Sequence, residues 1–354
     1  MRTPLPTRRF GRTTLDVTRV GFGAWAIGGA EWAFGWGEQD DRESIAAIRH
    51  AVARGINWID TAAAYGLGHS EEVVRRALAE LPAGERPYVF TKCGLLWDEA
   101  NRAAPPRRAA TAASVRRECE GSLRRLGVEA IDLYQVHWPA EDGTPVEEYW
   151  QAMLDLQAEG KVRHVGLSNH PVALLERAER LGHVESLQPP FSAVRRDTAP
   201  ELAWCAAHET AVIVYSPMQS GLLTGSFTAE RAARLGPDDW RSRSPDLTGE
   251  GLRRNLALAD ALRPIAARRG TSVASVAVAW TLAWPGVTAA IVGARSAGQV
   301  DGWLDAATLQ LTTDDLDEVA AAIEATGAGK GPVRVEEVGR DGRRTRNQEL
   351  GTRN

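Results

Sequence analysis

Short apolar segments alternate with helical segments along most of this chain, and this alternation constrains the fold more than any other feature. A short apolar run bounded by turn residues is typical of a buried strand, whereas apolar residues spaced three and four apart indicate a helix. We expect eight strands, at residues 20–22, 56–60, 88–92, 131–136, 162–167, 184–187, 211–215 and 287–292. Helical segments separate them in units of about 30 residues or more, which is the pattern of parallel βα units.

The alternation predicts an α/β fold, namely a single (β/α)8 TIM barrel over residues 1–325. A doubly wound open sheet is the alternative, but eight βα units are more than such sheets usually need. Residues 326–354 hold seven basic and four acidic side chains and few apolar ones, so we expect a polar C-terminal tail there. The remaining expected parts are an N-terminal hairpin at 8–12 and 15–18 and extra helices at about 250–269 and at 312–325.

Polar residues stand where several helices should begin. Asp40 with Glu43, and Ser296 with Gln299, have the spacing of capping boxes. Ser70 precedes two glutamates and is expected to cap the helix that follows the second strand.

Composition excludes several classes of protein. A net charge of −4 and a pI near 6.0 give no indication of nucleic-acid binding. No segment approaches the roughly 18 apolar residues of a membrane span, and the N-terminal segment lacks the apolar run of a secretory signal. The three cysteines are isolated and odd in number, which favours a reducing, cytoplasmic setting.

Two further patterns resemble binding motifs but lack their context. Residues 21–26 fit GxGxxA after a strand, yet the residues that follow form a poor helix, so we interpret them as the loop after the first strand. His50, His69 and His164 show neither HxxxH nor HxH spacing, so no metal site is expected.

Polar side chains occupy the ends of three consecutive expected strands. Asp60 ends the second strand, Tyr65 follows it, Lys92 ends the third and His137 follows the fourth. A buried ammonium is costly unless a carboxylate pairs with it, so Asp60 is the expected partner of Lys92. The cation should lower the pKa of the Tyr65 phenol and make it a general acid, while His137 hydrogen-bonds a substrate oxygen. Such a group suits protonation of an alkoxide formed when hydride reaches a carbonyl.

The sequence resembles the aldo-keto reductases over about residues 8–310. The matching segments, in the order of that family, are 59–72, 90–94, 132–139, 160–169, 188–190, 215–225 and 291–296. The His-Ser-Glu-Glu and His-Trp-Pro variants look most like the bacterial branch typified by the inositol-operon reductase. The resemblance implies that Tyr65 is the acid, that Lys92 and Asp60 tune it, and that His137 orients the substrate carbonyl.

The resemblance also implies a nicotinamide cofactor. The residues it assigns to the cofactor are Gly23, Ala24, Trp25, Asp60, Ser168, Asn169, Gln188, Tyr215, Ser216, Pro217, Met218, Ser220, Gly221, Leu222, Gly225, Gly293, Arg295 and Gln299. Among these, Tyr215 would stack on the nicotinamide ring, and Arg295 would meet a 2′-phosphate. Because a guanidinium binds phosphate well, NADP(H) is preferred and NAD(H) is the alternative. Asp301 and Trp303 depart from the family pattern, which leaves the adenine contacts open.

The sequence indicates the residues that contact the substrate less specifically than those that contact the cofactor. Trp25, Trp97 and Trp138 are expected to line an apolar pocket with Tyr65 and His137. The substrate is expected to be a small carbonyl compound or alcohol, with neither nucleic acid nor membrane as partner. A cofactor-binding regulatory protein of the same fold, and a barrel lyase or isomerase that needs no nicotinamide, remain the alternatives.

Overall fold

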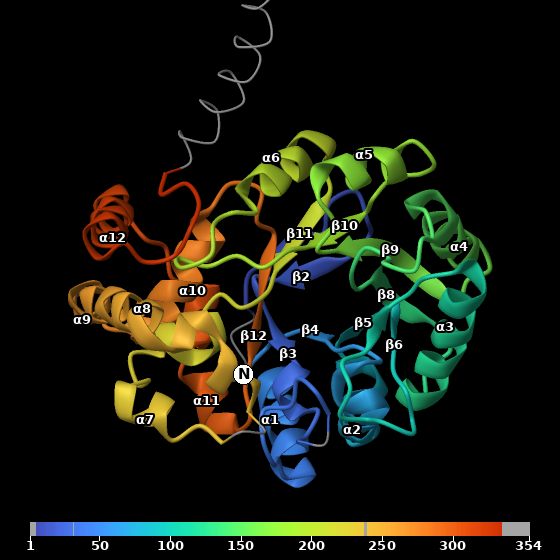
Figure 1. Cartoon of the computed structure of the whole chain (residues 1–354), viewed down its shortest axis with the longest axis horizontal. Coiled ribbons are helices and arrows are strands. Elements are labelled where there is room, and N and C mark those ends of the chain that lie inside the picture. Colours follow the sequence, from blue (N-terminus) through green and yellow to red (C-terminus); the bar gives the residue numbers. More distant parts are fainter. Residues whose placement is uncertain (1–4, 31, 237–238, 335–354) are drawn as a thin grey trace, which may run out of the picture.

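Eight parallel strands close on themselves in the spatial order β10-β11-β12-β3-β4-β5-β8-β9, with helices around them (Figure 1). This computed structural model describes residues 5–30, 32–236 and 239–334. The barrel strands are β3 (Val20–Gly23), β4 (Trp58–Asp60), β5 (Tyr88–Cys93), β8 (Ile131–Val136), β9 (Val162–Ser168), β10 (Ser186–Gln188), β11 (Ala211–Val214) and β12 (Ala289–Gly293). The prediction of a (β/α)8 barrel is therefore confirmed.

Helices follow the strands as the alternation predicts. Those packed around the barrel are α1 (Asp41–Ala53), α2 (His69–Ala79), α3 (Ala112–Leu126), α4 (Val146–Ala158), α5 (Val172–Glu179), α6 (Ala199–His208), α10 (Val273–Ala283) and α11 (Ala297–Asp301). The additional helices are α7 (Ala229–Ala233), α8 (Gly249–Ala261), α9 (Arg263–Arg269) and α12 (Thr313–Thr326). The single helix expected at 250–269 is thus two helices, because Pro264, in the first turn of α9, cannot donate a backbone hydrogen bond to the preceding helix.

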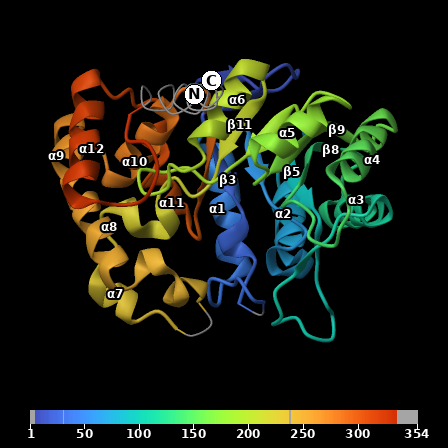
Figure 2. The same ribbon diagram turned by 45° about the horizontal axis from the view of Figure 1, so that its top comes forward.

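Short 3₁₀ turns occupy several of the loops. They are η1 (Trp25–Ile27), η2 (Tyr65–Gly68), η3 (Ala83–Glu85), η4 (Gln219–Thr224), η5 (Trp240–Arg243), η6 (Pro245–Leu247) and η7 (Leu304–Ala307). The loop after β5 also carries a small antiparallel pair, β6 (Leu95–Leu96) and β7 (Arg107–Arg108). In Figure 2 this loop and α7 project to the same side of the molecule.

An N-terminal hairpin closes the opposite end of the barrel. Its strands, β1 (Thr7–Arg9) and β2 (Asp16–Thr18), pair antiparallel as expected. Phe10, Leu15 and Val17 of the hairpin pack against apolar residues inside the barrel, among them Trp58 and Phe90. The hairpin therefore acts as an apolar plug beneath the strands.

Side chains alternate along each barrel strand and divide the interior into two layers. Trp58 and Phe90 lie in the apolar layer beside the hairpin. A Cβ atom at Gly21 would lie 2.1 Å from the Trp58 ring, so this indole packs directly against the backbone of the neighbouring strand β3. Two residues further along the strands, Asp60 and Lys92 form a polar layer at the C-terminal end. Because side chains that face inward recur at every second residue, the charged groups form a separate layer on the C-terminal side of the apolar layer.

The helix starts agree only partly with the expected caps. Asp40 does cap α1, through a 2.6 Å bond from the Arg42 N–H. Ser70 does not cap α2, because Gly68 occupies that position and the Ser70 hydroxyl donates instead to the Ala24 carbonyl at 2.9 Å. Ser296 stands at the start of α11 without a capping bond from its side chain.

The residues after α12 return to the barrel. A Cβ atom at Gly329 would lie 1.8 Å from the Val194 carbonyl oxygen, so only glycine permits this approach. Arg196 is buried and donates to the carbonyl oxygens of Ala328 and Pro332. Residues 328–332 therefore pack on the loop after β10, although they belong to the expected tail. The expected tail residues 335–354 lie outside the described part of the chain, and the domain boundary at 325 stays a prediction.

Within the described residues, no helix combines the length and apolar character needed to cross a membrane. All three cysteines are buried free thiols.

Candidate active site

A buried ion pair lies at the C-terminal end of the barrel. Lys92 Nζ is 2.6 Å from Asp60 Oδ2, and the side chains are only 0% and 3% exposed. The same ammonium donates to the Thr61 carbonyl oxygen at 2.8 Å. Because β4 and β5 are neighbours in the barrel, inward-facing residues at their ends must meet.

Removal from water governs the charge state of this pair. Burial raises the pKa of Asp60, and the charge of Lys92 only partly offsets the effect. Burial likewise lowers the pKa of Lys92 against the attraction of Asp60. Both directions mean that desolvation outweighs mutual attraction, so the pair is retained at a cost to stability.

Tyr65 approaches the ion pair from a turn with unusual backbone geometry. Its hydroxyl lies 3.4 Å from Lys92 Nζ. The next three residues all have left-handed backbone angles, with φ of 61° at Gly66, 56° at Leu67 and 102° at Gly68. A Cβ atom at Gly66 would lie 2.0 Å from the Gly28 carbonyl oxygen, so glycine is required for close contact between the two loops. This turn places the phenol over the barrel mouth.

The electrostatics of Tyr65 differ from the sequence-based expectation. Burial raises the pKa of Tyr65 well above its usual value, and the nearby charge of Asp60 raises it further. The expected net lowering of the Tyr65 pKa is wrong for this structure, because burial outweighs the attraction of Lys92, a cation that Asp60 already pairs at 2.6 Å. The phenol is therefore held in its protonated form.

His137 lies on the other side of the phenol. Its ring centre is 5.6 Å from that of Tyr65, and the two rings meet edge to face. Burial and the charge of Lys92 lower the pKa of His137 well below its usual value. A neutral imidazole beside a phenol provides two hydrogen-bonding groups at one point in the barrel mouth. The structure thus brings together the four residues expected to be catalytic.

A polar network continues around the barrel rim. Gln188 Nε2 donates to Asp60 Oδ1 at 2.9 Å, and Ser168 Oγ donates to the Gln188 carbonyl oxygen at 2.8 Å. Tyr215 OH donates to Asn169 Oδ1 at 2.8 Å, which fixes the half-buried ring. The expected nicotinamide residues therefore lie beside the ion pair.

Sequence reasoning missed Gln135, which lies in this polar layer. It is fully buried, and its Oε1 accepts a 3.4 Å bond from Gln188 Nε2. The sequence does indicate this position, because Gln135 stands two residues before His137 and so faces the same side of β8.

The other expected cofactor residues occupy loop ends on the same face. Gly23 and Gly293 pair in register at the ends of β3 and β12, and Ala24 donates its N–H to the Asp60 carbonyl. The segment from Ser216 to Gly225 contains the 3₁₀ turn η4, and its left-handed residues are Ser216, Gln219, Ser220, Gly221 and Gly225. This segment also contains the expected residues Pro217, Met218 and Leu222. The ring face of Tyr215 and the open backbone at Gly293, where a Cβ atom would meet only the Gly23 carbonyl oxygen at 3.7 Å, fit a flat ring that approaches the backbone closely.

Arg295 is engaged by the loop after β3. Its Nε donates to Gln39 Oε1 at 2.5 Å and its Nη1 to the Trp36 carbonyl at 3.2 Å, and its Nη2 contacts the Glu38 carbonyl. Gln299 Oε1 accepts from the Arg295 N–H at 2.8 Å, which replaces the expected capping box with Ser296. The guanidinium is therefore bound to the loop after β3. A phosphate group would have to displace these loop contacts in order to bind Arg295.

Aromatic side chains line the mouth next to Tyr65. The Trp25 ring lies 6.2 Å from the Tyr65 ring and stacks on Trp240 at 5.3 Å. Trp36 meets both indoles edge to face. Trp240 was not identified from the sequence, because the loop 216–248 shows no motif. It is anchored by its neighbours Asp239 and Arg241, whose ion pair of 2.6 Å is buried.

Trp97 and Trp138 belong to a different part of the rim. Trp97 donates to Glu99 Oε1 at 2.7 Å, and Arg108 lies 4.2 Å above the Trp138 ring. Both side chains are therefore held by the loop after β5, and their role in a substrate pocket stays a prediction.

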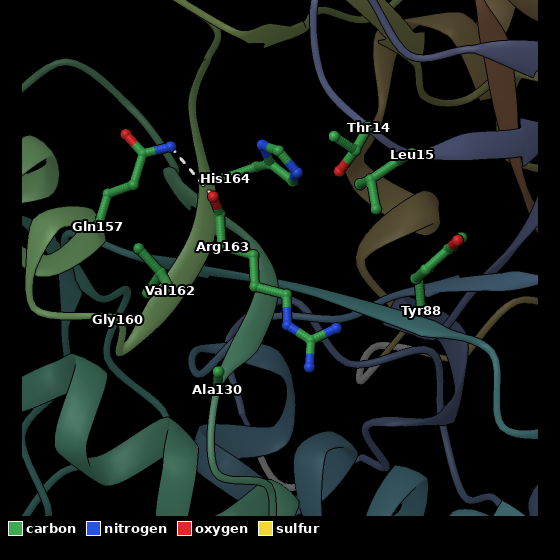
Figure 3. Close-up of a pocket in the computed structure, with 9 residues that line it drawn as sticks. All are labelled: Thr14, Leu15, Tyr88, Ala130, Gln157, Gly160, Val162, Arg163 and His164. Carbon is green, nitrogen blue, oxygen red and sulfur yellow. Dashed lines mark hydrogen bonds between the residues drawn. The ribbon is translucent and has the colours of Figure 1, made fainter.

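A cavity of about 500 Å³ lies away from these residues (Figure 3). Its lining residues come from the hairpin, from the end of α4 and from the N-terminal ends of β5, β8 and β9 with the residues just before them: Thr14, Leu15, Tyr88, Ala130, Gln157, Gly160, Val162, Arg163 and His164. Because Tyr88 and Lys92 stand at opposite ends of β5, this cavity is remote from the ion pair. Across the described segments, no group of three side chains is arranged to hold a metal ion.

Glu118 of α3 provides a pH-dependent contact behind the site. It is nearly buried and accepts the Gly94 N–H at 2.9 Å, where the loop after β5 begins. Burial raises the pKa of Glu118 from 4.5 to about 7. A raised folded-state pKa contributes stability below the unfolded value, and that contribution is lost as the pH rises through about 7.

We predict that Glu118→Gln removes this pH dependence. Relative to the native protein, the variant should gain about 3 kcal/mol of unfolding free energy as the pH rises from about 4 to about 8. Urea unfolding at both pH values measures the difference. The exposed Glu129→Gln serves as the control, and an equal pH dependence in native and E118Q proteins would contradict the prediction.

The chain is similar to a family model and to several known proteins. A model of the Aldo/keto reductase family matches residues 19–324. Aldo-keto reductase YhdN of Bacillus subtilis (strain 168) is 34% identical over 316 residues, covering 89% of this chain and 92% of that protein. The NADH-specific methylglyoxal reductase of Escherichia coli (strain K12) is 31% identical over 327 residues, covering 89% and 98%. The structure of the glycerol dehydrogenase AKR11B4 from Gluconobacter oxydans aligns with a TM-score of 0.82 at 36% identity, over 92% of this chain and 97% of that one.

These matches extend over the whole barrel and include the segments on which the resemblance rested. The relatives are named as reductases and a dehydrogenase, whereas the inositol-operon branch stays a prediction. The chain therefore belongs to the aldo/keto reductase family of oxidoreductases.

Proposed function

We propose that this protein is an NADP(H)-dependent carbonyl reductase, which also oxidises the corresponding alcohol. The observation that carries the proposal is the meeting of Tyr65 with Lys92 and His137 at the C-terminal end of the barrel. When bound, the nicotinamide supplies or accepts the hydride. The buried free cysteines agree with the reducing conditions of the cytoplasm, where we place the enzyme.

The protein residues would handle the substrate oxygen and its proton. During reduction, the oxygen gains negative charge as the carbonyl carbon accepts hydride. Tyr65 donates its phenolic proton to this oxygen, and neutral His137 donates a hydrogen bond that orients it. The raised pKa of Tyr65 keeps the phenol protonated before the reaction and makes it a weaker acid, so the proton moves only as the substrate oxygen gains the basicity of an alkoxide. Lys92, balanced by Asp60, stabilises the phenolate that remains.

The cofactor is proposed to lie across the same rim. Ser168, Asn169 and Gln188 would hold the carboxamide, and Tyr215 would stack on the ring. Arg295 would meet the 2′-phosphate of NADP(H) after giving up its contacts with the loop after β3. NAD(H) is the alternative, since one relative is named as NADH-specific.

We predict that Arg295→Gln discriminates between the two cofactors. A charge-assisted bond to phosphate contributes about 1.5–3 kcal/mol, so NADPH affinity should fall by about 10- to 100-fold while NADH affinity stays the same. Fluorescence titration with each cofactor measures this effect. The exposed Arg253→Gln is the control, and equal affinity of R295Q and native protein for NADPH would favour NAD(H).

The overall proposal is tested by a screen of aldehydes and ketones with NADPH and, in parallel, NADH. Loss of reduced-cofactor absorbance that depends on the carbonyl compound is the expected result. Tight cofactor binding without turnover of any compound would favour a regulatory protein of this fold. Failure to bind either cofactor would favour a lyase or isomerase.

A further inference from the structure

Strand β5 presents two polar side chains to opposite sides of the barrel wall. Lys92 faces inward, where it contacts Asp60 and the Tyr65 hydroxyl. Thr91 faces outward because side chains alternate along a strand. Its hydroxyl donates to Glu71 Oε1 at 2.6 Å. Lys92 thus contacts Tyr65, which precedes the left-handed turn, and its neighbour Thr91 bonds to Glu71, which follows the turn.

Glu71 is a fully buried carboxylate in the first turn of α2. Its second oxygen accepts a 2.6 Å bond from Arg125 Nε of α3. The Arg125 side chain also covers the turn, since a Cβ atom at Gly68 would lie 2.9 Å from its Cδ. Glu71 therefore joins α2, α3 and β5 at one point directly behind Lys92.

The segment between Tyr65 and Glu71 requires such a restraint. It includes the three left-handed residues of the turn, one of which is Leu67 rather than glycine. A left-handed backbone is unfavourable for leucine and persists only where surrounding contacts enforce it. Tyr65 touches Lys92 at one end of this segment, and Glu71 touches Thr91 at the other.

We infer that Glu71, held by Thr91 and Arg125, is a positioning residue that fixes the Tyr65 hydroxyl relative to Lys92. The inference rests on the proposed function, because it assigns Glu71 to the geometry of the proposed proton donor. The negative charge of Glu71 also raises the pKa of Lys92 and so supports its cationic form. The Ser70 hydroxyl separately joins α2 to the ends of β3 and β4, so α2 stays attached when the Thr91 bond is removed.

The chain offers a matched control for a buried carboxylate. Asp315 in α12 is 1% exposed and, like Glu71, bonds a threonine hydroxyl and an arginine, here Thr312 and Arg269. Because α12 lies at the edge of the molecule, away from β5, Asp315→Asn perturbs stability without reaching the mouth (Figure 1). Glu71→Gln and Asp315→Asn are therefore equivalent changes at near and remote positions.

The experiment compares Thr91→Val, Thr91→Ser, Glu71→Gln and Asp315→Asn in the full-length protein. We expect T91V and E71Q to lower kcat by about 10- to 100-fold with KM and cofactor affinity unchanged, because small misplacements of reacting groups have effects of this size. T91S should restore kcat, and D315N should lower only the melting temperature. Retention of full kcat in both T91V and E71Q would overturn the inference.

A second readout is independent of turnover. The chain has five tyrosines, so the ¹³Cζ resonance of Tyr65 can be assigned in a labelled sample. It should shift in T91V and E71Q at neutral pH and stay in place in D315N and T91S. If the native protein reduces no carbonyl compound but these shifts occur, the proposed function fails while the positioning role stands. Unshifted resonances in T91V and E71Q would refute that role.

Discussion

Replacement of Tyr65 by phenylalanine should lower kcat by about 10²- to 10⁴-fold, which is the range of general acid catalysis. The change removes the hydroxyl that lies 3.4 Å from Lys92 Nζ and leaves the ring that Trp25 and His137 contact. Cofactor affinity should therefore remain at the native value. Steady-state kinetics with a carbonyl compound found in the screen, together with cofactor titration, measure both quantities.

The control for this variant lies on β5. Tyr88 stands at the N-terminal end of that strand, beside the remote cavity, so Tyr88→Phe makes the same chemical change at the other end of the barrel. It should keep native kcat. Full activity in Y65F would show that another group donates the proton and would remove the central assignment of the proposed mechanism.

Replacement of Lys92 by methionine should have the second largest effect, and it should act on both activity and stability. The methionine keeps the length of the side chain but leaves Asp60 as a buried carboxylate without its cation. Breaking a buried pair in this way costs about 3–5 kcal/mol of unfolding free energy. Activity should fall with it, because no cation remains to stabilise a Tyr65 phenolate. Urea unfolding and steady-state kinetics test the two effects separately.

The double variant Asp60→Asn with Lys92→Met separates these contributions. Since desolvation outweighs attraction for both groups, removal of both charges should recover most of the lost stability. The introduced amide keeps an oxygen that can accept the bond from Gln188. Activity should stay low. A double variant as unstable as K92M alone would mean that the pair stabilises the fold, contrary to the directions of the two pKa shifts.

The sign of the pH dependence follows from Asp60. In K92M the attraction that lowers the pKa of Asp60 is gone, so the raised folded-state pKa rises further. Stability contributed by a raised carboxyl pKa is present at low pH and is lost as the pH rises through the folded value. K92M should therefore be less stable at about pH 8 than at about pH 5, a difference that the double variant should lack.

The fold was accessible from the sequence because each barrel strand is a short apolar run between turn residues. The polar residues that such strands would otherwise avoid, Asp60 and Lys92, also pointed to their own pairing. Their distance of 2.6 Å follows from neighbouring strands and a period of two along each strand. The roles of these residues stay predictions until the variants are measured.

Other features depended on contacts that no local pattern encodes. Serine is a residue type that often caps helices, but Gly68 occupies the capping position of α2. The Ser70 hydroxyl instead donates to the carbonyl of Ala24, which is distant in the sequence. Trp240 comes next to Trp25 only through the pairing of two long loops at Trp36 and Asp239. The raised pKa of Tyr65 reflects burial by those same loops, which local sequence does not reveal.

The three indoles from these loops also provide a spectroscopic consequence. Trp25, Trp36 and Trp240 have ring centres 5.3–5.8 Å apart, in one stacked and two perpendicular pairs. Chromophores held this close in fixed orientations couple their electronic transitions and give strong near-ultraviolet circular dichroism. Any ligand that separates the two loops would weaken that signal. Near-ultraviolet circular dichroism of the native chain would therefore report the separation of these loops at the barrel mouth.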